Sequence, residues 1–196
     1  MAAEPDVEAR IRTACADRAW DAAATLALET YGPELMSYLV ALLRNATEAD
    51  DVFGAVSEAL WRSLPEFRWD SSFRTYAYTI ARNAFVKHTK NPRNRAQAEA
   101  LSSPAVEAVA ANVRSRTATY LRTETKDKIA ELRAQLDPDD QTLLILRVSR
   151  QLPWRDIARI MAGSDDEPPD RRAAALRKRF ERLKDELRAR VASASE

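Results

Sequence analysis

The sequence predicts an all-α protein made of two small helical domains joined by a linker, and three observations support this prediction. Only 3 of the 196 residues are glycine, whereas sandwiches and barrels need glycine in their many tight turns. Apolar residues recur at helical spacing along most of the chain. Hydrophobic residues make up 45% of the sequence and charged residues 31%, a balance that suits folded helical units. The length allows two small domains, each with a modest core.

The first domain is predicted to span residues 1–95 and to contain three helices. The first helix is expected to begin at Gly32-Pro33, because proline suits a first helical turn. The second helix is expected to begin at Thr47 as its N-cap and to end at Pro65. The third is expected to begin after Ser71 or Ser72. The apolar stripes are Leu35, Leu39, Leu42 and Leu43; Val52, Val56, Leu60 and Leu64; and Phe73, Tyr76, Ala77, Ile80 and Ala84.

Residues 96–126 are predicted to form the linker, partly helical around Val106 to Leu121, with little core of its own. The apolar content thins there to alanine, valine and a few leucines.

The second domain is predicted to span residues 127–196. Asp137-Pro138 starts a helix, because aspartate caps and proline suits the first turn. After a break at residues 151–153 a compact helix is expected over Trp154 to Ala162, with Gly163 as its stop. A basic amphipathic helix follows, with apolar residues at Leu176, Phe180, Leu183, Leu187 and Val191. This order of elements is typical of a helix-turn-helix unit.

The net charge of +1 conceals a strong asymmetry along the chain. Residues 1–70 carry 6 basic and 13 acidic residues, whereas residues 71–126 carry 10 basic and 3 acidic residues. Residues 171–184 hold seven basic residues and one acidic residue. Such local excess of positive charge is typical of proteins that attract phosphate, although a solvated helix face would explain it equally well.

The sequence contains no pattern that predicts catalysis. Cys15 is the one cysteine and His88 the one histidine, so neither a disulfide nor a zinc site is expected. The acidic pairs lie at expected helix starts or in a loop, where capping explains them. We therefore expect no catalytic residue, no metal and no cofactor. No apolar run approaches the length of a membrane span, and no secretory signal is evident, so a cytoplasmic location is expected.

Aromatic and basic residues alternate on the helix predicted over residues 73–90. Single-stranded nucleic acid binding needs this combination, because rings stack on bases while cations hold phosphates. Two other segments carry information: residues 48–67, where an acidic helix start leads to Trp61-Arg62, and residues 151–158, which precede the basic helix.

At these residues the chain resembles the extracytoplasmic-function (ECF) group of sigma factors of the sigma-70 family. The order of the motifs carries the resemblance: Asp50-Asp51-Val52, Leu60-Trp61-Arg62, Phe73-Arg74 and Ile80-Ala81-Arg82-Asn83, followed by the helix-turn-helix. The resemblance covers roughly Tyr31 to Leu187.

The resemblance implies three binding surfaces and no enzymatic activity. The helix around residues 50–62 would dock on the coiled coil of the polymerase clamp. The segment over residues 67–90 would bind the −10 element, trap a flipped base near residues 69–72, and hold the opened strand. The last basic helix would enter the major groove at the −35 element, where arginine can pair with guanine.

The residues at matching positions follow for each surface. Polymerase binding is expected at Asp50, Asp51, Val52, Leu60, Trp61 and Arg62. Binding to the −10 element is expected at Trp69, Ser71, Ser72, Phe73, Arg74, Tyr78, Arg82, Asn83, Lys87, His88 and Lys90. Binding to the −35 element is expected at Trp154, Arg155, Arg171, Arg172, Arg177, Lys178, Arg179 and Arg182. The implied partners are core RNA polymerase, promoter DNA and an anti-sigma factor or other regulator.

The chain departs from the family pattern at several positions. Gly54-Ala55 stands where the family commonly has Gln-Glu or Gln-Asp, and Tyr76-Ala77 replaces Trp-Leu. Lys87 replaces a frequent aspartate, and the acidic turn over residues 164–170 is longer than usual.

Two other classes of function stay open at this point. One is a stand-alone helix-turn-helix regulator that binds duplex operators as a dimer. The other is a helical interaction module that occupies a sigma-binding partner. The aromatic and basic helix discriminates against both, because neither needs a surface that melts DNA.

Overall fold

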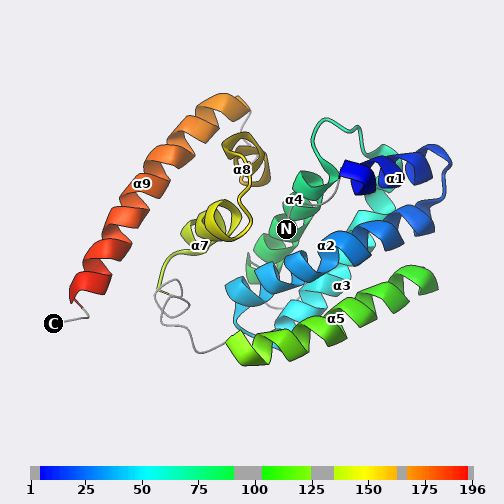
Figure 1. Ribbon diagram of the computed structural model, residues 1–196, viewed down its shortest axis with the longest axis horizontal. Helices are drawn as coiled ribbons and strands as arrows, with labels where there is room; N and C mark the ends of the chain where they lie inside the picture. Colours follow the sequence, from blue (N-terminus) through cyan, green and yellow to red (C-terminus); the bar gives the residue numbers. More distant parts are fainter. Residues whose placement is uncertain (1–4, 91–102, 125–134, 163–166, 194–196) are drawn as a thin grey trace. The chain divides into compact units, whose positions relative to one another are not determined.

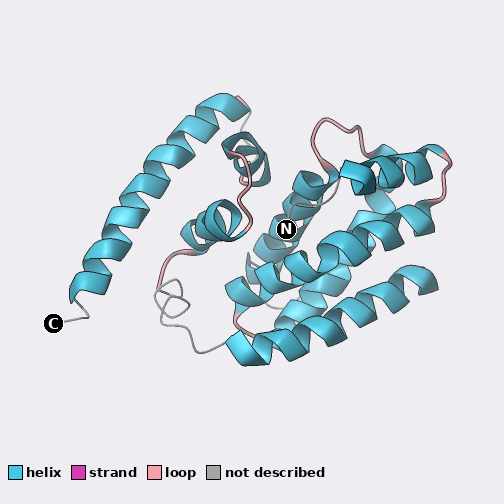
Figure 2. Cartoon of the chain, in the orientation of Figure 1, coloured by secondary structure: helices cyan, strands magenta, loops and turns pink. Residues whose placement is uncertain are grey.

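The computed structural model describes residues 5–90, 103–124, 135–162 and 167–193 (Figure 1). These residues form helices, turns and loops without a strand, so the predicted all-α class is confirmed (Figure 2). The chain divides into two compact units, Met1–Thr125 and Lys126–Glu196. Each unit is described by itself.

The first unit is a helical bundle. Its elements are α1 (Pro5–Ala16), α2 (Trp20–Leu43), α3 (Ala46–Ser63), a short 3-10 turn η1 (Leu64–Glu66), α4 (Phe73–Lys90) and α5 (Pro104–Glu124). The long helix α2 packs against α1, α3, α4 and α5, so it forms the centre of the bundle (Figure 1). The largest fully buried side chains of this unit are Tyr31, Tyr38, Tyr78, Phe53, Phe73, Ile11, Leu28, Leu35, Met36, Leu39 and Leu60.

Helix α2 begins earlier than the sequence predicted. It starts at Trp20, and Pro33 lies inside it rather than in its first turn. Both Pro33 and Glu29, the residue whose carbonyl loses its helical donor to the proline, are exposed. Water can therefore satisfy that carbonyl, and packing of the apolar residues on either side keeps the helix continuous.

The predicted N-cap of α3 was wrong, whereas that of α4 is confirmed. The N-cap of α3 is Asn45, not Thr47, because the Asn45 side chain accepts hydrogen bonds from the backbone N–H groups of Thr47 and Glu48. At α4 the Ser72 hydroxyl accepts a hydrogen bond from the Thr75 N–H at 3.1 Å, as expected of a cap. Helix α3 ends at Ser63, just before Pro65, which also agrees with the prediction.

The segment expected as a linker contains a helix that belongs to the first unit. Helix α5 packs along α2 and α3, and it buries Val106, Ala110 and Val113 (Figure 1). These residues lie at i, i+4 and i+7 and so form one apolar stripe. The expectation of little core in this segment was wrong, because a narrow stripe of small apolar residues suffices where the opposing helices carry glycine.

The second unit contains α7 (Pro138–Leu144), a π-helical turn η3 (Ile145–Ser149), α8 (Trp154–Ile160) and α9 (Pro169–Ser193). Asp137 is the N-cap of α7, as predicted, and accepts hydrogen bonds from the N–H groups of Asp139 and Asp140. Helix α9 packs on both α7 and α8. The predicted stop at Gly163 lies outside the described residues.

Candidate nucleic-acid interface

Four aromatic rings cluster where the loop over residues 67–72 enters α4. Phe67 stacks on Tyr76 with ring centroids 4.3 Å apart, and Trp69 lies 4.7 Å from Phe67. Phe73 is fully buried beneath them, whereas Phe67, Trp69 and Tyr76 are partly exposed. Partly exposed rings on a buried base form a platform on which nucleobases can stack. The residues that the resemblance assigned to −10 binding include Trp69 and Phe73 but not Phe67 or Tyr76.

Trp69 holds an unusual backbone conformation. Its φ angle of 60° lies in the left-handed region, which residues other than glycine rarely adopt. The Arg12 guanidinium of α1 covers its ring at 4.6 Å from the centroid. A strained backbone held by its surroundings is common at binding sites, so the loop is built to keep this ring in one place.

The start of α4 is bound by a carboxylate from α1. Glu8 accepts hydrogen bonds from the backbone N–H groups of Phe73 at 2.8 Å and Arg74 at 3.1 Å, and from the Tyr31 hydroxyl at 2.9 Å. Burial, followed by the charge of the Glu8 carboxylate, raises the pKa of Tyr31 above its ordinary value. A carboxylate at a helix N-terminus satisfies free N–H groups and is favoured by the helix dipole. Sequence reasoning missed Glu8, because its partners lie 65 and 66 residues away.

Helix α4 presents a polar stripe that runs on from the aromatic cluster. Asn83, Lys87 and Lys90 are exposed and lie at i, i+4 and i+7, so they share one face of the helix. Ser72, at the helix start, is also exposed, and Ser71 and Arg82 are half-buried.

Four residues predicted to bind the −10 element are used inside the bundle. Phe73 and Tyr78 are fully buried, so their side chains support the surface rather than form it. Arg74 forms a two-pronged ion pair with Glu34 of α2, each contact 2.7 Å long. His88 lies 3.1 Å from Glu48, with its side chain 9% exposed, and this contact joins the end of α4 to the start of α3.

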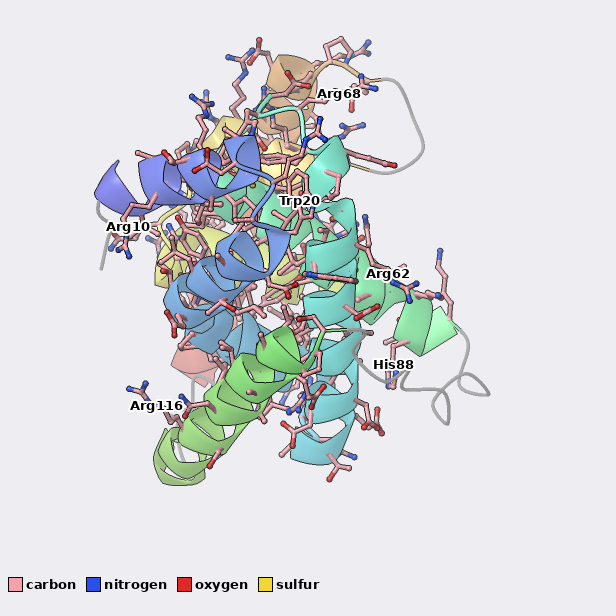
Figure 3. The ribbon with its side chains drawn as sticks, turned by 90° about the vertical axis from the view of Figure 1, so that its right-hand side faces the viewer. Arg10, Trp20, Arg62, Arg68, His88 and Arg116 are labelled. Atoms are coloured by element: carbon pink, nitrogen blue, oxygen red, sulfur yellow. The ribbon has the colours of Figure 1, made fainter. Side chains whose placement is uncertain are left out.

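Four of the six predicted polymerase-binding residues of α3 fall into a buried pair and an exposed pair. Val52 and Leu60 are buried in the core, so they fix the position of the helix and cannot contact a partner directly. Asp51 and Arg62 are exposed; Arg62 also pairs with Glu58, and its side chain is 57% exposed (Figure 3).

The other two predicted residues of α3 are partly covered. Trp61 donates a hydrogen bond from its indole N–H to the Asp21 carboxylate at 2.6 Å. Asp50 has one carboxylate oxygen buried without a hydrogen-bond partner. Burial of this group raises the pKa of Asp50 above its ordinary value, and the nearby charge of Arg114 acts in the opposite direction.

In the second unit Trp154 lies at the start of α8, where its ring contacts side chains of η3 and α9. Its ring packs edge-on against Phe180, with centroids 5.5 Å apart. The guanidinium groups of Arg147 and Arg177 lie over the same ring at 4.9 and 5.9 Å. Stacking of this kind holds a long cationic side chain in a defined direction. Trp154 therefore positions Arg177, which is itself exposed.

The basic residues of α9 divide between an exposed and a packed group. Arg171, Lys178 and Arg182 are exposed at i, i+7 and i+11 and so share one face. Arg179 instead pairs with Asp140 and Asp137 at the start of α7, and its hydrogen bond to Asp140 raises the pKa of this arginine.

The two other predicted arginines of the second unit also differ in their exposure. Arg172 is buried and pairs with Glu167 at 3.8 Å. Arg155 on α8 is 63% exposed and lies 3.6 Å from Asp170.

Comparison with known proteins places these surfaces in a family context. Residues 27–95 match the family described as Sigma-70 region 2. The chain is also 29% identical over 136 residues to the RNA polymerase sigma-H factor of Pseudomonas aeruginosa, a match that covers 67% of this chain and 70% of that protein. Both similarities support an RNA polymerase sigma factor. The region 2 match contains most of α2, all of α3 and α4, and the whole aromatic cluster.

A sigma factor directs promoter recognition together with core RNA polymerase, and this is the function that both similarities support. Within the part of the chain that the structure describes, no helix is both long enough and apolar enough to cross a membrane.

Proposed function

We propose that this protein is a sigma factor of the ECF group that binds core polymerase through α3, opens the −10 element with the start of α4, and binds the −35 element with α9. The protein acts by binding rather than by catalysis, and it acts in the cytoplasm. An anti-sigma factor or another regulator controls access to these surfaces.

The aromatic platform at the start of α4 is the observation that carries this proposal. Phe67, Trp69 and Tyr76 offer partly exposed rings on a buried base, and the exposed stripe at Asn83, Lys87 and Lys90 follows on the same helix. Rings that stack on unpaired bases, beside cations that hold phosphates, are what strand opening requires. A regulator that binds only duplex DNA needs no such platform.

The second unit supports the proposed contact with the −35 element. Arg171, Arg177, Lys178 and Arg182 are exposed on α9, while Arg172 and Arg179 are held by carboxylates of the same unit. The exposed group therefore supplies the candidates for base and phosphate contacts. The packed group gives the recognition helix its orientation.

Reconstitution with core RNA polymerase tests the proposed function. The purified chain should co-elute with bacterial core polymerase on gel filtration and direct run-off transcription from a specific promoter. Absence of both, together with tight binding of the chain alone to a duplex operator, would favour the stand-alone regulator.

A charge reversal on α4 separates promoter opening from polymerase binding. The variant Lys87→Glu with Lys90→Glu should reduce run-off transcription at least tenfold, because it replaces attraction of phosphates with repulsion. Co-elution with core polymerase should be unchanged. Arg10→Glu with Arg116→Glu, at two exposed positions outside α4 (Figure 3), makes the same change of total charge and is the control. Equal transcription by the α4 variant and the control would contradict the role assigned to the α4 stripe.

A further inference from the structure

Helix α5 covers a face formed by α2 and α3. Its stripe of Val106, Ala110 and Val113 is fully or almost fully buried, and it packs on both of these helices. Helix α3 therefore packs against α2, α4 and α5. From Asp51 to Ser63, the well-exposed residues of α3 are Asp51, Ala55 and Arg62.

Two glycines face α5, and one of them is in close contact with it. At Gly32 on α2, a Cβ atom would lie 3.0 and 3.2 Å from the two methyl groups of Val113, closer than ordinary packing allows. At Gly54 on α3, a Cβ atom would lie 3.6 Å from the Arg114 guanidinium. The ECF resemblance predicts glutamine at residue 54, where this chain has glycine. This departure from the family pattern therefore lies in the contact between α3 and α5.

The interface between α5 and α3 leaves one buried polar atom without a hydrogen bond. Arg114 pairs with Glu107 of its own helix at 2.9 Å and exerts its charge on Asp50, yet one oxygen of the Asp50 carboxylate is buried without a hydrogen-bond donor. A buried polar atom without a partner opposes the packing that surrounds it. The interface between α5 and α3 therefore combines good apolar contacts with an electrostatic penalty, as expected of a contact that can open.

We propose that α5 is an intramolecular cover of the α2–α3 face, and that it leaves this face when the chain binds core RNA polymerase. The proposal rests on the proposed function, which assigns α3 to the clamp of the polymerase. That clamp element is itself a helical coiled coil. In the free chain, α5 therefore covers the face with a helix, as the clamp would in the complex. Asp50 is one of the residues expected to bind polymerase, and it interacts electrostatically with Arg114 of α5.

Such a cover lowers the apparent affinity for polymerase without changing the contacts in the final complex. If only a fraction of the molecules has the face open, the apparent dissociation constant rises by the inverse of that fraction. Closing the cover permanently should therefore weaken binding, and loosening it should strengthen binding.

A reversible disulfide tests the closed state in the full chain. Gly32→Cys with Val113→Cys places two thiols at positions that already lie within van der Waals contact, in a Cys15→Ser background that leaves no other cysteine. Binding to fluorescently labelled core polymerase would be measured before and after reduction, with the Cys15→Ser protein as the control for the reductant. Circular dichroism would establish that both forms retain the helical fold.

The oxidised protein should bind core polymerase at least tenfold more weakly than the same protein after reduction. Equal affinity of the two forms would overturn the proposal and would make α5 a permanent part of the domain. Binding by neither form, nor by the parent chain or the variant below, would overturn the proposed function itself and this proposal with it.

A charge reversal tests the open state without a crosslink. Arg114→Glu places a carboxylate beside Asp50 and Gly54, and it should loosen α5 and raise the affinity for core polymerase several-fold. Arg116→Glu makes the same change of charge two residues further along α5, where the side chain is exposed and points away from the bundle (Figure 3). The control should bind like the parent chain. A loss of affinity in Arg114→Glu with retained helicity would contradict the cover.

Discussion

Glu8 shows how one side chain can join three helices at the scale of a single residue. Its carboxylate, on α1, accepts hydrogen bonds from two backbone N–H groups of α4 and from the hydroxyl of Tyr31 on α2. All three hydrogen bonds are partly buried, so water replaces the acceptor only in part when the Glu8 carboxylate is removed. The same contact fixes the start of α4, beside the loop that carries Trp69.

Replacement of Glu8 by alanine should therefore destabilise the first unit by about 1–2 kcal/mol, the range for loss of a helix cap. Urea unfolding followed by circular dichroism measures this change. Arg10→Ala, two residues further along the same helix and exposed, should stay within about 0.5 kcal/mol of the parent chain. In the Tyr31→Phe background the effect of Glu8→Ala should be smaller, because one of the three donors is already absent. An unchanged free energy of unfolding in Glu8→Ala would show that the capping contact contributes nothing.

Helix α9 illustrates how a single element divides its charges between structure and binding. On one side it packs Leu176, Phe180 and Leu183 into the core of the second unit, and Arg179 ties it to the start of α7. On the other side Lys178 and Arg182 face solvent. The same residue type thus serves two purposes within one helical turn.

Two arginine variants on α9 should therefore have opposite effects. Arg179→Ala should reduce stability by about 1 kcal/mol, because a charged hydrogen bond between partly exposed partners is lost, and it should weaken −35 binding only through this loss of order. Arg182→Ala should leave stability unchanged and weaken binding to a −35 duplex by about 1–3 kcal/mol if it contacts a base. Thermal unfolding and fluorescence anisotropy with promoter DNA measure the two quantities. The roles would be reversed if Arg182→Ala lowered stability and Arg179→Ala reduced only DNA binding.

At the scale of the whole molecule the chain consists of two compact units, each with its own core. Gly32 and its neighbours belong to the first unit, and the pairs around Arg179 belong to the second. Substitutions in different cores share no partner, so their effects on stability should add.

Unfolding in urea should accordingly show two separable transitions. Gly32→Val, which forces a larger side chain against Val113, should shift only the transition of the first unit, by about 1–3 kcal/mol. Arg179→Ala should shift only the other. Tryptophan fluorescence cannot separate the units, because both contain tryptophan, so hydrogen exchange resolved by peptide is the suitable measurement. A single transition that both variants shift together would mean that the units unfold as one.

Local chemistry explains the elements that could be predicted from the sequence. Asp137 before Pro138, Ser72 before α4 and Pro65 after α3 each act on neighbours within a few residues, and each was placed correctly. Apolar periodicity likewise revealed the all-α class and the order of helices in the second unit, because the residues of an apolar helical stripe are only three or four positions apart in the sequence.

The predictions failed where packing overrode a local signal. The sequence around Pro33 predicts a helix start, yet Pro33 lies within α2. The helix continues through it because apolar residues of α2 before and after Pro33 are buried in the core of the first unit. The segment of α5 reads as a linker because its stripe contains mainly alanine and valine. Only Gly32, on another helix, gives this stripe a close-fitting partner. Among the expected site residues, Val52, Leu60, Phe73 and Tyr78 proved to be buried for the same reason.

The sequence by itself therefore determined the helical class, the caps at Ser72 and Asp137, the aromatic and basic character of α4 and the basic character of α9. These properties depend on residues that are close in the chain. Only the tertiary structure decided which of those side chains face solvent, that Glu8 caps a helix 65 residues away, and that α5 lies over α2 and α3. Such contacts join residues far apart in the sequence, and they exist only once the helices have packed, so no local pattern records them.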